Sequence, residues 1–216
     1  MARGINTKCL HLEEEEGCCN NYGSISFPIY QTATYAHPAV GQSTGFDYSR
    51  LQNPTREHLE RIVATLENGI DALAFSTGMA AITLVMELFK PGDHLIVDAD
   101  LYGGSIRLFD NVSAKNGLQF SRIDCWKEDV ESYVNENTKA IYIETPTNPM
   151  MNVTDIAALA EIAKRHNLLL IVDNTFLSPY FQNPLDLGAD LVVHSGTKFL
   201  GGHNDSLAGF VVSIRA

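Results

Sequence analysis

Positive charge is scarce in this sequence. Its 216 residues include 15 Lys and Arg against 26 Asp and Glu, which gives a formal net charge of −11. Such a surface repels nucleic acid and anionic membranes, because both are negatively charged themselves. No apolar run approaches the roughly 20 residues that a membrane-spanning helix requires, and the N-terminal stretch MARGINTKCLHLEEEEGCC lacks the apolar core of a secretion signal. We therefore expect a cytoplasmic protein that binds neither nucleic acid nor membranes.

Cysteine pairs with the spacing of metal ligands are also missing. The four cysteines contain no CxxC pair, and two of them are adjacent, which does not suit a disulfide framework: Cys9, Cys18, Cys19 and Cys125. We expect reduced thiols and no metal. The alternative is a metal site built from His11, Cys18, Cys19 and the run Glu13 to Glu16, but this spacing matches no standard ligand pattern.

Three common functional motifs are absent as well. Neither GxxxxGK[ST] nor a GxGxxG after an apolar run occurs, which excludes the usual nucleotide-binding loops. A hydrolase triad of Ser76, Asp173 and a histidine would lack the GxSxG turn that exposes the nucleophile in many α/β hydrolases. The sequence therefore favours neither a nucleotide-binding protein nor a serine hydrolase.

Short apolar runs alternate with helical patterns from residue 54 onward. The runs predict buried strands at 71–75, 94–98, 140–144, 168–173, 190–194 and 207–214. Amphipathic or apolar segments predict helices at 54–66, 78–90, 105–117, 127–136 and 154–167. This alternation is typical of an α/β fold, in which a mostly parallel sheet is covered on both faces. The first fifty residues lack such periodicity and indicate an extended arm.

Polar residues follow the predicted strands as a set. Ligands of open α/β sheets bind beyond the carboxyl ends of the strands, so these residues are expected to lie together. One edge would then collect an anion-binding turn (STGMAA), an aromatic ring, an amide, a carboxylate and an amine. The residues concerned include Gly78, Met79, Tyr102, Asn148, Asp173, Thr175, Ser195, Thr197 and Lys198.

One cofactor uses all of these groups. Pyridoxal phosphate (PLP) needs a lysine for its Schiff base, a carboxylate beside its pyridinium nitrogen, an anion site and often an aromatic face. Lys198 and Asp173 supply the first two. Simpler interpretations remain for each part: a plain strand-to-helix turn at STGMAA, a lysine that only completes a phosphate pocket, and an aspartate that only caps the next turn.

Six motifs in this order carry a family resemblance: YSRLQNPTR, STGMAA, DLYGGSIRLF, ETPTNP, VDNTF and HSGTKFLGGHND. They resemble the PLP-dependent enzymes of cysteine and methionine metabolism, the trans-sulfuration family of cystathionine γ-synthase, the cystathionine lyases and methionine γ-lyase. The resemblance runs from about Ser26 to the end. It implies the large domain of a fold-type I PLP-dependent transferase, preceded by an extended N-terminal arm.

The resemblance also implies residue roles. Lys198 would form the internal aldimine and move protons, and Tyr102 would stack on the ring and help to deprotonate the incoming amine. Asp173 would pair with the ring nitrogen. The other implied cofactor contacts are Gly78, Met79, Ser195 and Thr197 at the phosphate, Asn148 and Thr175 at the polar edge of the ring, and Tyr48 and Arg50 at the phosphate of a neighbouring subunit.

The domain organisation that the resemblance implies is an arm at residues 1–50 that reaches a neighbouring subunit, and a PLP-binding large domain, truncated, at residues 51–216. Related enzymes form homotetramers built from dimers that share active sites. They continue into a small C-terminal domain, which supplies an arginine for the substrate carboxylate. We expect that domain to be absent from this chain.

The implied function is that of a C–S lyase or transferase of the cystathionine γ-synthase or γ-lyase type. It would catalyse β- or γ-elimination or γ-replacement on a sulfur-containing or O-acylated amino acid. The alternatives are cystathionine β-lyase, methionine γ-lyase, O-acylhomoserine sulfhydrylase, a non-catalytic fragment or paralogue, and an aminotransferase. Gly104 stands where methionine γ-lyases typically place a cysteine, which disfavours that activity.

Overall fold

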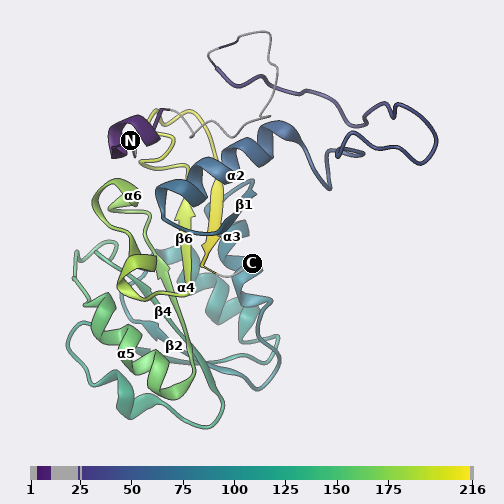
Figure 1. Cartoon of the computed structure of the whole chain (residues 1–216). Helices are drawn as coiled ribbons and strands as arrows, with labels where there is room; N and C mark the ends of the chain where they lie inside the picture. The colour runs from purple at the N-terminus through teal and green to yellow at the C-terminus, as the bar shows by residue number, and fades with distance from the viewer. Residues whose placement is uncertain (1–3, 11–23, 25, 215–216) are drawn as a thin grey trace.

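The computed structural model describes residues 4–10, 24 and 26–214. Its centre is one seven-stranded sheet flanked by helices (Figure 1). The strands are β1 (Asp71–Phe75), β2 (His94–Asp98), β3 (Gln119–Ile123), β4 (Thr138–Glu144), β5 (Leu169–Asp173), β6 (Leu191–Ser195) and β7 (Gly209–Ser213). Their order across the sheet is β1-β7-β6-β5-β4-β2-β3, and only β7 runs antiparallel to its neighbours. This arrangement confirms the predicted α/β class.

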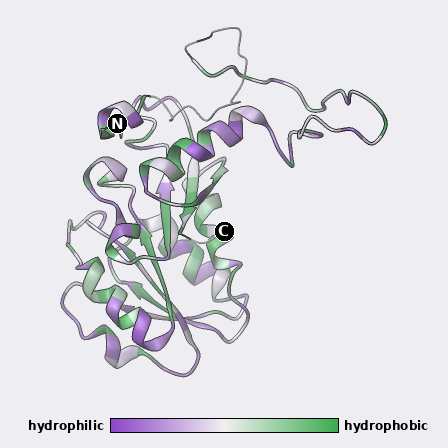
Figure 2. Ribbon diagram, in the orientation of Figure 1, coloured by the Kyte–Doolittle hydropathy of each residue, from purple (hydrophilic) through white to green (hydrophobic). Residues whose placement is uncertain are grey.

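Side-chain alternation along the central strands builds a core on each face of the sheet. Because successive residues of a strand point to opposite faces, Ile141 and Ile143 of β4 enter one core, whereas Ala140 and Tyr142 enter the other. Helices α2 (Pro54–Leu66) and α5 (Ile156–His166) cover the first core. Helix α3 (Gly78–Met86) and the region of α4 (Gly103–Leu108) cover the second. In Figure 2 most strands are accordingly green, which marks hydrophobic residues. Purple, which marks hydrophilic residues, lies on the outer helices.

Local sequence explains where the longer helices begin. The side chain of Asn53 accepts the N–H of Thr55 at 2.9 Å at the start of α2. Asp155 accepts the N–H of Ala158 at 3.0 Å at the start of α5. Such caps satisfy N–H groups that have no partner within the helix. The predicted starts of these two helices are therefore accurate to within two residues.

Several predicted boundaries are wrong. The helix predicted at 127–136 is only the 3₁₀ turn η2 (Val130–Tyr133), because Val130 is the one buried residue of that turn. The helix predicted at 105–117 divides into α4 and the π-helical segment η1 (Phe109–Ser113). Strand β3 was not predicted, because it lies at the sheet edge and its sequence QFSRI is largely polar. The remaining short elements are α1 (Ile5–Lys8), α6 (Ser178–Phe181) and η3 (Pro184–Leu187).

Residues 26–53 form an arm that projects from the body of the molecule (Figure 1). Its only bridges in the described chain are isolated ones, Thr34 with Tyr48 and Ala39 with Gln42. The arm is fixed at its base, where the N–H of Tyr30 donates to Oγ1 of Thr55 at 2.9 Å. The predicted extended character of this segment therefore agrees with the structure.

The alternative metal site lies outside the described residues, as do Cys18 and Cys19. Within the ranges that the structure covers, no group of three His, Cys, Asp or Glu side chains is placed to hold a metal ion. Cys9 and Cys125 are free thiols there, the first exposed and the second buried. No helix of the described part is long and apolar enough to cross a bilayer.

Candidate active site

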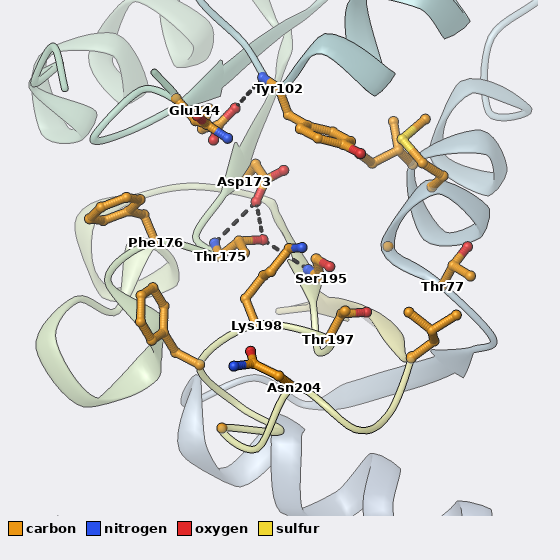
Figure 3. A pocket seen from close by; sticks show the side chains of 17 residues that line it. Thr77, Tyr102, Glu144, Asp173, Thr175, Phe176, Ser195, Thr197, Lys198 and Asn204 are labelled. Carbon is orange, nitrogen blue, oxygen red and sulfur yellow. Dashed lines mark hydrogen bonds between the residues drawn. The ribbon is translucent and has the colours of Figure 1, made fainter. Parts of the chain in front are cut away.

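A cavity of about 720 Å³ opens where β4, β5 and β6 end, beside the start of α3. This is the sheet edge at which open α/β folds bind ligands. The cavity gathers side chains from five separate stretches of the chain (Figure 3). The predicted site residues that line it are Gly78, Met79, Tyr102, Asn148, Asp173, Thr175, Ser195, Thr197 and Lys198.

Asp173 is the last residue of β5, and its side chain is buried. A buried carboxylate needs donors or a cation, because it has lost its contact with water. Thr175 supplies two donors: its N–H lies 3.0 Å and its hydroxyl 2.6 Å from Oδ1 of Asp173. Burial raises the pKa of Asp173, and the hydrogen bonds from Thr175 oppose that rise. Both of these bonds end on Oδ1, and the Asp173 side chain lines the cavity.

Lys198 follows β6 in a turn where backbone and side chains approach closely. Its N–H donates to the carbonyl of Ser195 at 3.1 Å. A Cβ atom on Gly196 would lie 2.5 Å from the ring of Phe210, so only glycine fits the turn at that position. Figure 3 shows the Lys198 side chain extending into the cavity, with its amine on the side of Asp173.

The first turn of α3 lies directly against Ser195. A Cβ atom on Gly78 would be 2.8 Å from Cβ and 2.9 Å from Cα of Ser195. The hydroxyl of Thr77 caps this helix by accepting the N–H of Ala80 at 3.0 Å. A helix N-terminus attracts anions through its N–H groups and its dipole, and the side chains of Ser195 and Thr197 line the same cavity. This corner can therefore hold a phosphate group.

Tyr102 stands at the mouth of the cavity and is 43% exposed. Its N–H donates to Oε2 of Glu144 at 2.7 Å, which ties the segment before α4 to the end of β4. Its ring packs on Gly104 and Met79: a Cβ atom on Gly104 would lie 2.3 Å from the ring and 2.8 Å from the Met79 sulfur. The ring is therefore held between the backbone of α4 and the first turn of α3.

Comparison with known proteins identifies the family. The model of the Cys/Met metabolism PLP-dependent enzymes matches residues 6–215. The chain belongs to this family. Its relatives include a cystathionine gamma-synthase/O-acetylhomoserine (thiol)-lyase and a cystathionine gamma-lyase of Bacillus subtilis, 58% identical over 191 residues and 54% identical over 192. A cystathionine beta-lyase of Lactococcus lactis subsp. cremoris is 49% identical over 192 residues.

The fold agrees with solved structures of relatives. The chain superimposes on metB from Corynebacterium glutamicum with a TM-score of 0.93 at 43% identity, and on cystathionine gamma-lyase from Lactobacillus plantarum, complexed with L-serine, with 0.90 at 46% identity. Each alignment covers 98% of this chain and 55% of the solved one. The three relatives above are matched over 88% of this chain and 50–51% of their own length. The chain thus spans about half the length of its relatives.

Members of the Cys/Met family depend on PLP, and the cavity has the donors that this cofactor requires. A lysine amine, a buried carboxylate and a helix N-terminus packed against Ser195 line the same space. The glycine at position 78 lets the first turn of α3 pack directly against Ser195, because a Cβ atom there would lie 2.8 Å from the Ser195 Cβ. The residues present therefore fit the cofactor.

Tyr48 and Arg50 lie elsewhere, on the arm. The Arg50 guanidinium lies 5.0 Å from the centre of the Tyr48 ring, within the range of a cation–π contact. Arg50 lines a second hollow of about 550 Å³ between the base of the arm and α2. The structure therefore does not bring these two predicted site residues to the cavity of their own chain.

The cavity is also lined by residues that were not predicted from the sequence. Glu144 is the most notable of them. It ends β4 just as Asp173 ends β5, and this position at a strand end could have identified it as a site residue from the sequence. Phe176 and Phe199 meet edge to face at 5.9 Å, and nothing in their local sequence announces this contact. The lining residues that were not predicted are Thr77, Ile82, Glu144, Phe176, Phe199, Gly202, Asn204 and Leu207.

Proposed function

We propose that this chain is the cofactor-binding part of a PLP-dependent enzyme that cleaves or exchanges bonds at Cβ or Cγ of a sulfur-containing or O-acylated amino acid, of the cystathionine γ-synthase or γ-lyase type. The observation that carries this proposal is that Lys198 and Asp173 line the same cavity at the carboxyl edge of the sheet. Relatives at 58% and 54% identity with synthase and lyase names support the reaction type.

Bound PLP would supply an electron sink for the carbanion formed at the substrate Cα. Lys198 would hold the cofactor through its amine and carry protons to and from the substrate. Asp173 would keep the ring nitrogen protonated, because a buried carboxylate favours a cationic partner. Tyr102 would cover one face of the ring and help to deprotonate the incoming amine.

The remaining contacts would orient the cofactor. N–H groups at the start of α3 and two hydroxyls would bind the phosphate, and an amide and a hydroxyl would lie at the polar edge of the ring. The residues assigned to these tasks are Gly78, Met79, Ser195 and Thr197 for the phosphate, and Asn148 and Thr175 for the ring.

The arm would complete the site of another subunit. In this proposal the described part of the segment predicted at 1–50, residues 26–50, extends to a neighbour, where Tyr48 and Arg50 contact the phosphate, and residues 51–216 form the cofactor domain. The projection of the arm from the body (Figure 1) supports this assignment, as does the forked guanidinium of Arg50, which suits phosphate. We further propose a cytoplasmic homotetramer built from dimers that share active sites.

A cystathionine β-lyase is the second candidate, because relatives of that name are 49% identical to the chain. The two candidates share every cofactor contact proposed above. They differ in whether the bond broken lies at Cβ or Cγ, so product analysis with cystathionine distinguishes them: homocysteine indicates β-cleavage, and cysteine indicates γ-cleavage.

Visible absorption and chemical trapping test the cofactor assignment. We expect the purified chain with added PLP to gain a visible absorption band, and borohydride to fix the pyridoxyl group on Lys198. Lys198→Ala should lose both signals, whereas Lys139→Ala, at the opposite end of β4 and exposed, should keep both. A wild-type chain that stays colourless with saturating PLP, or a label that maps to another lysine, would contradict the proposal.

A further inference from the structure

Two buried carboxyl groups lie side by side on the wall of the cavity. Glu144 and Asp173 are paired residues of the parallel strands β4 and β5, so their side chains point to the same face of the sheet. Their exposed fractions are 4% and 5%, and Figure 3 shows both directed toward the cavity. Two adjacent carboxyl groups that have lost contact with water do not ionise independently, because each charge opposes the other.

Hydrogen bonding differs between the two groups. Asp173 accepts two bonds from Thr175 on one oxygen, whereas the one bond described for Glu144 comes from the N–H of Tyr102. Hydrogen bonds to a carboxylate favour its charged form. Asp173 is therefore better prepared than Glu144 to carry the negative charge of the pair.

The surroundings of Glu144 also favour its protonated form. Burial and the neighbouring charge of Asp173 raise the pKa of Glu144 to about 8, the acids at the end of β2 add to the rise, and the Tyr102 N–H opposes it. The titratable groups around the pair come from several elements: Asp98 at the end of β2, Asp100 after it, Tyr142 within β4, Asp173 on β5, His194 on β6 and Lys198 across the cavity.

We propose that Glu144 carries a proton at neutral pH while Asp173 carries the charge, so that the pair presents a single negative charge to the cavity. Because Oε2 of Glu144 accepts the Tyr102 N–H, the proton resides on Oε1. Glu144 is then a positioning residue with two tasks: it holds the segment that carries the Tyr102 ring, and it keeps a second charge away from Asp173.

This inference deepens the proposed function and rests on it in one respect, namely the pairing of Asp173 with a cationic ring nitrogen. A single carboxylate balances a single pyridinium charge. If both carboxyl groups were ionised, one negative charge would remain buried without a partner, which is costly at low polarity. The protonated Glu144 removes that cost and still anchors Tyr102.

Infrared spectroscopy of the purified chain without cofactor tests the proton directly. A protonated carboxyl group has a carbonyl stretch that a carboxylate lacks. We expect wild-type protein at pH 7 to show this band and to lose it with a midpoint near pH 8. Glu144→Gln, which retains an oxygen acceptor for the Tyr102 N–H, should lack the band. Asp173→Asn should keep the band and move its midpoint to lower pH, because the neighbouring charge is gone.

The matched control is Glu128→Gln. Glu128 also accepts a backbone N–H, from Asp124 at 2.8 Å, but its hydrogen bonds lower its pKa, so this variant should keep the wild-type band. A band that survives in Glu144→Gln and disappears in Asp173→Asn would overturn the inference, and so would wild-type protein without the band at pH 7. Circular dichroism verifies that each variant folds. The infrared result does not depend on cofactor binding. A separate titration with PLP therefore distinguishes failure of the proposed function from failure of this inference about the proton.

Discussion

Thr175 connects the two polar groups at the base of the candidate active site. Its hydroxyl donates to Asp173 at 2.6 Å and at the same time accepts the N–H of Ser195 at 2.8 Å. One small side chain therefore fixes the carboxylate proposed for the ring nitrogen and the backbone proposed for the phosphate corner. Nothing in the local sequence around Thr175 predicts this double contact.

Thr175→Val should remove both hydrogen bonds while it preserves the size and branching of the side chain. The buried Asp173 would lose a donor and the Ser195 N–H would lose its acceptor, so we expect the free energy of unfolding to fall by about 1–3 kcal/mol and PLP to bind more weakly. Thr154→Val is the control, because the buried Thr154 hydroxyl has no partner among the described residues. Chemical denaturation and PLP titration measure the two effects. Equal stability of both variants would contradict this role.

Asp98 gives a prediction about pH. It ends β2 fully buried, and burial raises its pKa from the ordinary 3.8 to about 6. Between these two values the folded protein keeps a proton that the unfolded chain has lost, so this group makes stability fall as pH rises from about 4 to about 6. The loss amounts to about 3 kcal/mol, from 1.36 kcal/mol for each pH unit.

Asp98→Asn should therefore be more stable than wild type above pH 6, and the difference should vanish toward pH 4. The exposed Asp129→Asn controls for a change of net charge. Urea unfolding at a series of pH values gives the comparison. A difference in the free energy of unfolding between Asp98→Asn and wild type that stays constant from pH 4 to pH 7 would contradict the prediction.

At the scale of elements, the docking of α3 on β6 depends on the absence of a side chain at Gly78. Gly78→Ala would place a Cβ atom 2.9 Å from the backbone of Ser195, so one of the two elements must move. We expect lower stability and weaker PLP binding. Gly103→Ala is the matched control: it also begins a helix, and its Cβ atom would meet only the flexible end of Arg107 at 3.4 Å. Unchanged PLP affinity in Gly78→Ala would show that this corner does not hold the phosphate.

The sequence predicted elements well where burial is strong and poorly where it is weak. Strands β4 and β5 are covered on both faces, so their residues are apolar on both faces. Their sequences therefore form continuous apolar runs, which are easy to recognise as buried strands. Edge strand β3 buries only Ile123 fully, and its polar residues hide the pattern. The turn at Val130 has helical composition but only one buried residue to hold it. In these places tertiary contacts decide the outcome more than local preference does.

The same physical distinction applies to the candidate site. The carboxyl ends of parallel strands lie at one edge of a sheet. The sequence alone was therefore enough to predict that Asp173, Asn148 and Lys198 lie close together. It could not place Phe176 and Phe199, whose contact depends on how two loops fold over the cavity. Tyr48 and Arg50 are a different case, because a single chain does not contain the neighbour that they are proposed to serve.

At the scale of the whole molecule, the proposed role of the arm leads us to expect that two defective variants restore a site when they form a mixed dimer. Arg50→Ala and Lys198→Ala should each bind PLP poorly on their own. If Arg50 acts on a neighbour, a mixed dimer has one site with Lys198 from one chain and Arg50 from the other. After unfolding and refolding together, about a quarter of the sites should then regain the wild-type PLP spectrum, as random pairing of two-fold dimers requires.

The control for this experiment is separate refolding of each variant followed by mixing without exchange. It should give no recovery, since each dimer then keeps two defective sites. Recovery of Arg50→Ala alone at wild-type PLP concentration would show that Arg50 is not needed. No recovery after joint refolding would place Arg50 outside the neighbour's site.

The position of β7 affects how the chain folds during its synthesis. Within the described residues β1 pairs with β7 alone, in a register that begins with Asp71 and Ser213. Among the described strands, β1 is the first to be synthesised, and it therefore has no pairing partner until β7 emerges. Meanwhile β1 has unpaired N–H and C=O groups that other chains can bind, and closure across so long a stretch of chain is slow. Premature release of the nascent chain before Gly209 would leave an open sheet that is prone to aggregate.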